Sequence, residues 1–139
     1  MINAVYQGAD MLTCTMPIHL TRNFKAFIFK STLKGLIPQK RDIEGDTADK
    51  FIEEYLDLSD GKFLKDTSPL QSGCNCHACR SHTRSYIHHL FKSEELLGEV
   101  LLYIHNQYQV TQFMEDIRLR LNDRDSFVKW ANLDPKYYS

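Results

Sequence analysis

The stretch GCNCHACRSHTRSYIHHL, residues 73–90, carries three of the four cysteines of this 139-residue chain. Cys74, Cys76 and Cys79 fall in one short loop, which therefore offers three sulfur donors close together. A structural zinc ion takes four nitrogen or sulfur ligands in a tetrahedron, and such a loop can wrap the ion while a separate element supplies the fourth ligand. We therefore expect one structural zinc ion here.

Two other uses of the cysteines fit the pattern less well. Cys76 and Cys79 have the C-x-x-C form of a redox pair, but that pair leaves Cys74 unexplained. A disulfide framework is typical of secreted chains, and the start MINAVYQGAD lacks the basic and apolar regions of a secretory signal. Cys14 lies among apolar residues, and we interpret it as a small core residue. Redox chemistry or free thiols remain the alternative to zinc.

The fourth ligand stays open when spacing alone is considered. His82 follows Cys79 closely enough for a compact zinc knuckle. His105 lies on a predicted long helix, from which a ring nitrogen can reach a metal held by the preceding loop. His88 and His89 are neighbours on a short helix, where one can face the core and the other water. The residues by themselves leave His82 and His105 as equal candidates.

Length and composition predict one soluble globular domain. The chain is 42% hydrophobic and 25% charged, which is ordinary for such a domain, and its length supports a single modest core. No apolar run approaches the roughly 18 residues of a membrane-spanning helix. Together with the lack of a secretory signal, this predicts a cytoplasmic protein.

The formal net charge of -1 conceals two oppositely charged segments. Residues 1–41 carry six Lys or Arg against one acid, and residues 42–60 carry eight acids against one Lys. A basic first third can contact phosphates. A solvated basic face balanced by an acidic insertion explains the same pattern equally well.

Turn signals and hydrophobic periodicity predict short elements before the cysteines. Apolar runs rich in β-forming residues indicate strands, and Asp-Gly is a strong hairpin signal. The expected elements are a helix end at 1–7 stopped by Gly8, strands at 11–17 and 24–30, a helix at 46–56 capped by Asp46, and a hairpin turn at Asp60-Gly61.

Beyond the cysteines the pattern is helical. Residues 82–92 form one predicted helix. A long helix is expected to start at Ser93, with Glu94 and Glu95 near the positive end of its dipole. Its apolar residues recur with a period of about 3.6 residues. The predicted buried stripe consists of Leu97, Val100, Leu101, Ile104, Tyr108, Thr111, Met114, Ile117 and Leu121.

The segment from residue 73 to residue 106 resembles the zinc-binding segment of the tRNA-guanine transglycosylase family. The family segment has a C-x-C-x-x-C loop, an H-x-R-x-Y-I-H-H-L helix, an E-L-L step and a histidine followed by asparagine. In this sequence the corresponding residues are 74–79, 82–90, 95–97 and 105–106.

Further stretches extend the resemblance to about residues 8–121. GADMLTCTMP, residues 8–17, is similar to a family strand, and KFLKDTSPLQSGCNC, residues 62–76, is similar to the lead into the zinc loop. The resemblance implies that the zinc ligands are Cys74, Cys76, Cys79 and His105.

The chain departs from the catalytic members of the family at one decisive position. Thr13 stands where they carry the aspartate that forms a covalent link to the tRNA, and a threonine hydroxyl without an activating base is a poor substitute. His19 replaces the first arginine of the basic loop, of which only Arg22 is kept. Residues 42–60 look like an insertion. These features are similar to the family's non-catalytic accessory subunits, so we predict that the chain is not an enzyme.

The resemblance implies an α/β fold, the C-terminal portion of a TIM barrel of the transglycosylase type with a zinc-binding subdomain and a long C-terminal helix. Most of the barrel, including the guanine pocket, is expected to lie outside the matched part. The expected domains are 1–41, the end of the barrel with a helix end, a strand and a hairpin; 42–66, the acidic insertion and a hairpin; 67–125, the zinc-binding helical subdomain; and 126–139, a C-terminal tail.

The implied function is support of guanine-to-queuine exchange at the tRNA wobble position, through a heterodimer with the catalytic subunit. A homodimer is the alternative assembly, tRNA contact is indirect, and the family's accessory subunit is implied to sit partly on the mitochondrial outer surface. The candidate contact residues, which fit an internal core equally well, are Tyr86, Ile87, Leu90 and Phe91.

Two rival functions remain. One is an active transglycosylase that uses Thr13. The other is a stand-alone structural zinc module that binds RNA through its basic first third, with Lys25, Lys30 and Lys34 as phosphate contacts.

Overall fold

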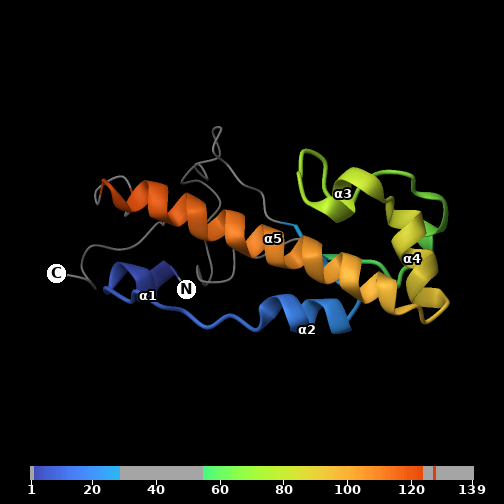
Figure 1. Ribbon diagram of the computed structural model, residues 1–139, viewed down its shortest axis with the longest axis horizontal. Helices are drawn as coiled ribbons and strands as arrows, with labels where there is room; N and C mark the ends of the chain where they lie inside the picture. The colour runs from blue at the N-terminus through green and yellow to red at the C-terminus, as the bar shows by residue number, and fades with distance from the viewer. Residues whose placement is uncertain (1, 29–54, 124–126, 128–139) are drawn as a thin grey trace, which may run out of the picture.

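A long helix, α5, is the central element of the computed structural model. The structure describes residues 2–28, 55–123 and 127. Helices α2, α3 and α4 and strand β1 all pack against α5 (Figure 1). The elements are α1 (Ile2–Tyr6), α2 (Met16–Arg22), β1 (Lys25–Phe27), β2 (Tyr55–Asp57), the 3-10 helix η1 (Gly61–Lys65), α3 (His77–Ser81), α4 (Arg84–Lys92) and α5 (Leu96–Leu121).

The two described strands form a small antiparallel sheet, with Ala26 opposite Leu56. The strand predicted at 24–30 is confirmed for Lys25–Phe27, and residues 29 and 30 lie outside the described part. The helix predicted at 46–56 is wrong at its end, because Tyr55 and Leu56 belong to β2; its earlier residues are not described. The described strands do not include a parallel pair, so the barrel origin of residues 1–41 stays a prediction.

Pro17 and Asp60-Gly61, which predicted a strand end and a hairpin turn, both mark helix starts instead. The strand predicted at 11–17 is absent: residues 11–15 have no regular structure, and α2 begins at Met16 with Pro17 in its first turn. Proline suits that place because the first helical N–H groups have no partner within the helix. The hairpin predicted at Asp60-Gly61 is also absent, since the Asp60 carboxylate accepts the Lys62 N–H and caps η1.

Helix α4 ends in a hydrogen-bonding pattern that decides where α5 begins. The Glu94 N–H donates to the Phe91 carbonyl and the Glu95 N–H to the Leu90 carbonyl, which is the Schellman motif. Glu94 takes the left-handed position of this motif, with φ of 54°. The long helix therefore starts at Leu96, and the predicted start at Ser93 is wrong, because Ser93 is the last residue of the α4 cap.

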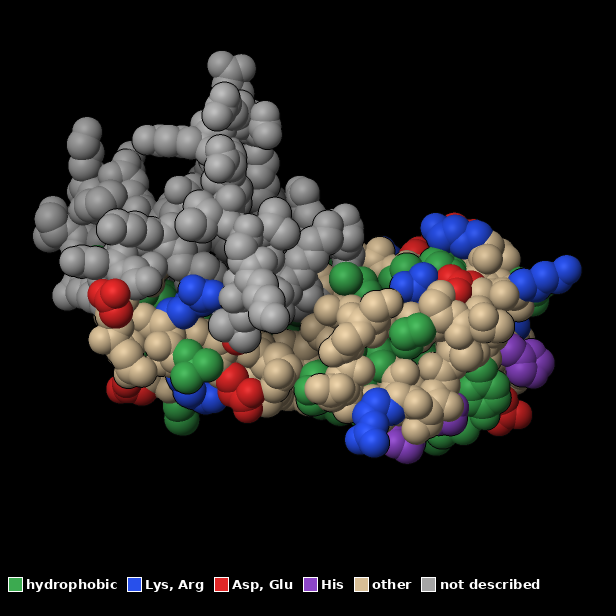
Figure 2. Space-filling view, turned by 90° about the horizontal axis from the view of Figure 1, so that it is seen from above, with side chains coloured by type: hydrophobic (Ala, Val, Ile, Leu, Met, Phe, Trp, Pro, Cys, Tyr) green, Lys and Arg blue, Asp and Glu red, His purple; other side chains and the backbone are tan. Residues whose placement is uncertain are grey.

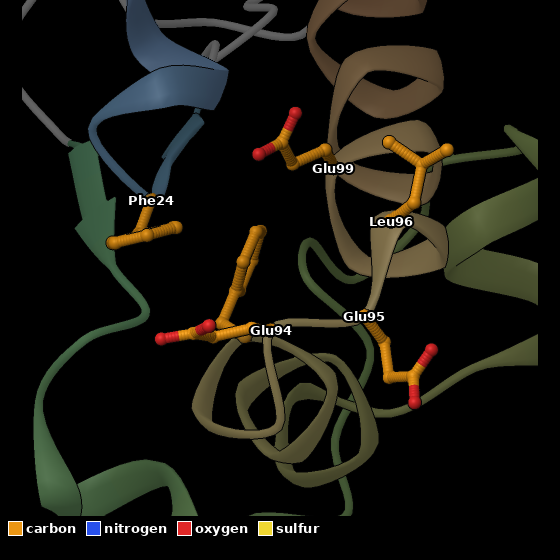
Figure 3. Close-up of a pocket in the computed structure, with 6 residues that line it drawn as sticks. Phe24, Glu94, Glu95, Leu96 and Glu99 are labelled. Carbon is orange, nitrogen blue, oxygen red and sulfur yellow. The ribbon is translucent and has the colours of Figure 1, made fainter.

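Residues of the α4–α5 junction form one side of a pocket of about 330 Å³. Its apolar side comes from Phe24, Phe91 and Leu96, and the two phenylalanine rings lie 4.5 Å apart. Figure 3 shows Phe24 across the pocket from the side chains of Glu94 and Glu99. The pocket is thus an apolar hollow with an acidic rim.

The buried face of α5 is not the predicted one. Of the predicted stripe, Leu101 and Ile117 are buried, whereas Leu97 and Val100 are 45% and 44% exposed. Polar side chains take the central positions instead, because they bond to the strand and the loop packed against the helix, as described below. The buried residues are Gly98, Leu101, Leu102, His105, Asn106, Gln109, Val110, Phe113, Asp116 and Ile117.

Two hydrophobic clusters lie along α5. The first joins η1, α4 and the first half of α5, and Cys74, Cys76 and Cys79 pack into it. The second is built around Phe113, on the later half of α5, and Phe127, which lies beyond the end of that helix; Cys14 is a partly buried neighbour of it. Cys14 therefore contributes to packing as predicted, although not from a strand.

The short helix α4 separates its two adjacent histidines as predicted. His88 is buried and its ring Nδ1 donates to the Leu58 carbonyl at 2.6 Å, whereas His89 is exposed. Ile87 and Leu90 point into the first cluster. No helix among the described residues is both long enough and apolar enough to cross a bilayer.

Candidate metal centre

Four side chains from two distant parts of the chain meet beside the middle of α5. The Sγ atoms of Cys74, Cys76 and Cys79 and a ring nitrogen of His105 all lie within 4.8 Å of one another. The His105 Nδ1 is 3.8, 3.5 and 3.3 Å from these three sulfurs in chain order. This cluster has the donors and the spacing to hold one metal ion, and below it is called the Cys₃His cluster.

The local sequence explains how the loop brings its sulfurs together. Gly73 has φ of 78°, a left-handed conformation that favours glycine, and it turns the chain just before Cys74. Cys76 is the N-cap of α3, and its Sγ accepts the Cys79 N–H at 3.4 Å. Ala78 is fully buried and anchors α3 in the first cluster. The loop therefore curls around a point that faces α5.

His105 is fully buried and oriented by strand β1. Its Nε2 donates to the Phe27 carbonyl at 2.9 Å, so the proton of the neutral ring sits on Nε2. The lone pair of Nδ1 then points at the sulfurs and is free for a metal. Metal-bound histidines almost always have such a partner on the other nitrogen, which fixes both the tautomer and the ring orientation.

The neighbouring Asn106 completes the link to the strand. Its Oδ1 accepts the Phe27 N–H at 2.7 Å, and its Nδ2 donates to the Lys25 carbonyl at 3.0 Å and to the Thr21 hydroxyl at 3.1 Å. Together His105 and Asn106 bind both backbone groups of Phe27. Sequence reasoning noted this His-Asn step but missed the structural role of the asparagine.

The cluster stabilises negative charge on Cys74 and positive charge on His105. The pKa of Cys74 is lowered because the Cys76 and Cys79 thiols hydrogen-bond to its sulfur, and the pKa of Cys79 is raised because its own proton is held in that contact with Cys74. Burial disfavours a charged His105 ring, but hydrogen bonds and the negative charge of Cys74 and Cys76 outweigh burial and raise the pKa of His105 to about 9. The site thus stabilises a positive charge beside Nδ1, where a metal cation would take the place of the second ring proton.

The rival ligand His82 lies elsewhere. Its ring stacks on Tyr86, with ring centroids 5.1 Å apart, and lies edge-on to His77. It is not a member of the Cys₃His cluster. Thr13 is exposed between α1 and α2, and no side chain in the described ranges hydrogen-bonds to it. The geometry therefore favours His105 as the fourth ligand.

The four ligands leave a tetrahedral ion without an open position for water. A metal in this centre would tie the loop and α3 to α5 and, through His105 and Phe27, to β1. Such closed sites supply folding free energy rather than chemistry. The arrangement is therefore that of a structural metal centre.

Comparisons with known proteins agree with the resemblance drawn from the zinc loop. The family model described as queuine tRNA-ribosyltransferase matches residues 1–133. The queuine tRNA-ribosyltransferase accessory subunit 2 of Drosophila melanogaster is 34% identical over 119 residues, covering 84% of this chain and 25% of that protein, and its counterpart in Drosophila sechellia matches to the same extent.

A bacterial relative is similar at nearly the same level. The queuine tRNA-ribosyltransferase of Francisella tularensis subsp. novicida is 32% identical over 123 residues, or 88% of this chain and 27% of that protein. The chain thus spans about a quarter of the length of these curated relatives. It belongs to the queuine tRNA-ribosyltransferase family, the tRNA-guanine transglycosylases.

Proposed function

We propose that this chain is part of a non-catalytic subunit that supports exchange of guanine for queuine in tRNA by pairing with a catalytic transglycosylase subunit. The observation that carries the proposal is Thr13, which stands where the resemblance expects the nucleophilic aspartate and has no activating partner among the described residues. The similarity to proteins named accessory subunit 2 supports it. In this proposal residues 1–41 are the end of the family's barrel.

We also propose that the metal is zinc, bound by Cys74, Cys76, Cys79 and His105. With Zn–S and Zn–N bonds of about 2.3 and 2.0 Å, a sulfur and a nitrogen on tetrahedral zinc lie about 3.5 Å apart. The three Sγ to Nδ1 distances, from 3.3 to 3.8 Å, scatter around that value. Three thiolates and one imidazole are also the donors that zinc prefers.

The α4 and α5 surface offers a place for the partner subunit. Of the four contact residues considered from the sequence, Ile87 and Leu90 are core, whereas Tyr86 is 38% exposed. The first half of α5 adds an exposed apolar flank made of Leu96, Leu97, Val100 and Tyr103. Exposed apolar side chains that gather on one flank commonly mark an interaction surface.

This flank continues into the acidic-rimmed pocket at the α4–α5 junction, to which Leu96 belongs. Figure 2 shows hydrophobic side chains, with histidine beside them, on the surface at the end of the molecule where Figure 1 places α4. These features support a protein partner that meets this end of the molecule.

Co-purification with the catalytic subunit tests the proposal. We expect a complex with the zinc-loaded chain, a weaker one for the double variant Tyr86→Ala/Val100→Ser, and none after chelation. Thr111→Ala, an exposed change further along α5, is the matched control and should leave binding unchanged. If the unaltered, zinc-loaded chain formed no complex, the proposed partnership would be refuted.

The rival enzyme function has its own test. After incubation with tRNA, a denaturing gel of the chain alone should show no shifted band, because no carboxylate nucleophile is in place at Thr13. A covalent adduct that forms with the unaltered chain and not with Thr13→Ala would show that the chain is catalytic, and would refute the accessory role.

The RNA-binding module remains a second candidate because of one observation. Residues 1–41 carry six Lys or Arg against one acid. If the chain binds tRNA by itself, replacing Lys25, Lys30 and Lys34 by alanine should flatten the salt dependence of binding. The accessory role predicts little change in that measurement.

A further inference from the structure

Gln109 contacts the Cys₃His cluster at Cys74. Its side chain is 4% exposed, and its Nε2 donates to the Cys74 Sγ at 3.2 Å. Gln109 follows His105 by one helical turn, so both side chains lie on the same face of α5. Side chains on a helix lean toward its N-terminus, which brings the Gln109 amide back toward the metal position.

The charge of the cluster explains why such a donor is needed. Three thiolates around a divalent ion leave a net charge of -1 in a largely buried place. Hydrogen bonds from N–H groups to the sulfurs spread that charge, and partners of this kind tune metal sites. Cys76 receives the backbone N–H of Cys79 within α3. Cys74 lies in the loop before α3, and Gln109 supplies its N–H from another element.

A neutral amide is the suitable group for this position. A glutamate of the same length would place a carboxylate against a thiolate, and an apolar side chain would leave the sulfur without this donor. Cys74 is also the ligand whose sulfur lies farthest from His105 Nδ1, at 3.8 Å. The Gln109 amide holds this sulfur from a second side.

We propose that Gln109 is a positioning residue of the metal centre, whose amide holds the Cys74 thiolate by an N–H···S hydrogen bond. The bond strengthens metal binding and lowers the reactivity of that sulfur. This role goes beyond the proposed subunit function, because it concerns how the centre holds its metal whether or not a partner is bound.

The test compares Gln109→Met, which keeps the length of the side chain but has no donor, with the matched control Gln107→Met, an exposed change on the same helix. Zinc affinity is measured on the full chain by competition with a chromogenic chelator. We expect a loss of about tenfold or more for Gln109→Met, the usual effect of removing such a partner, and no loss for Gln107→Met.

A second readout separates positioning from packing. With Co²⁺ in place of zinc, removal of the N–H donor should shift the sulfur-to-metal charge-transfer band of Gln109→Met to lower energy, because the thiolate becomes a better electron donor. Alkylation of the metal-bound Cys74 by iodoacetamide should also become faster. A variant that only loosens packing would weaken metal binding without moving the band.

Unchanged zinc affinity together with an unchanged cobalt band in Gln109→Met overturns the proposal, and so does a lower affinity with an unchanged band. Should Gln109→Met fail to fold, Gln109→Asn gives the decision, because it keeps the amide but withdraws it by one methylene. We expect Gln109→Asn to change the zinc affinity and the cobalt band in the same directions as Gln109→Met. If both values equalled those of the unaltered chain, the proposed role would be refuted.

Discussion

At the scale of single residues, the long-range bonds of α5 are made by neighbouring polar side chains. His105 bonds to Phe27 and Asn106 to Lys25, partners 78 and 81 positions away in the sequence. Hydrophobic periodicity places such residues on the solvent side. For this reason the predicted buried stripe of α5 differs from the face that the structure buries. Burial of an amide is tolerated when its hydrogen bonds are satisfied, as they are here.

We predict that replacing Asn106 lowers the free energy of unfolding more than replacing an exposed polar residue of α5. Asn106→Leu leaves the buried N–H of Phe27 without its partner and deprives the Lys25 carbonyl of one donor. We expect a loss of about 2–4 kcal/mol in the free energy of unfolding, measured by urea denaturation of the zinc-loaded chain. Gln112→Leu, which disturbs only an exposed contact, is the control; equal effects of the two changes would contradict the role of Asn106.

The assignment of the fourth ligand makes a separate prediction. His105→Ala should purify with far less zinc than the unaltered chain, because a three-ligand loop holds the ion poorly. His82→Ala should keep its zinc, since His82 stacks on Tyr86 away from the cluster. Elemental analysis decides between them, and loss of zinc only in His82→Ala would show that the ligand is misassigned.

The sequence predicted the candidate metal ligands better than the groups that support them. Close spacing marks Cys74, Cys76 and Cys79, and the family resemblance adds His105. Gln109 and Asn106 could not be found in this way, because their partners come from elements whose packing no local pattern reveals. A glutamine one helical turn after a candidate metal-binding histidine is the one local signal that the sequence offered.

At the scale of elements, the helices after the cysteines followed from their patterns, but their boundaries did not. The Schellman turn between α4 and α5 is normally marked by glycine, and here Glu94 occupies that position. Without the glycine, the sequence showed only a serine and two glutamates, which are typical of a helix start. At α2 the ambiguity was different, because a proline after an apolar run suits the end of a strand as well as the first turn of a helix.

This junction predicts a stabilising change. A non-glycine residue in the left-handed conformation is strained, so Glu94→Gly should raise the free energy of unfolding by about 1 kcal/mol. Glu95→Gly is the matched control, because Glu95 has an ordinary extended φ of -83° and gains nothing from glycine. Thermal unfolding of the zinc-loaded variants measures both. A stabilisation of Glu95→Gly and not of Glu94→Gly would mean that the turn is placed wrongly.

At the scale of the whole molecule, the candidate metal centre joins parts that lie far apart in the sequence. It connects the cysteine loop and α3 with α5, while His105 and Asn106 carry that connection to β1 and α2. A structural zinc ion contributes about 10–16 kcal/mol in small zinc domains, as much as the entire stability of a typical domain, about 5–15 kcal/mol. The described fold should therefore depend on the ion.

The most direct test is to determine the metal content of the purified chain and then to follow its helical circular dichroism while the metal is chelated. The account predicts one zinc ion per chain, and loss of the cooperative thermal transition once the ion is removed. A chain that is free of metal and still unfolds cooperatively at the same temperature would contradict the account.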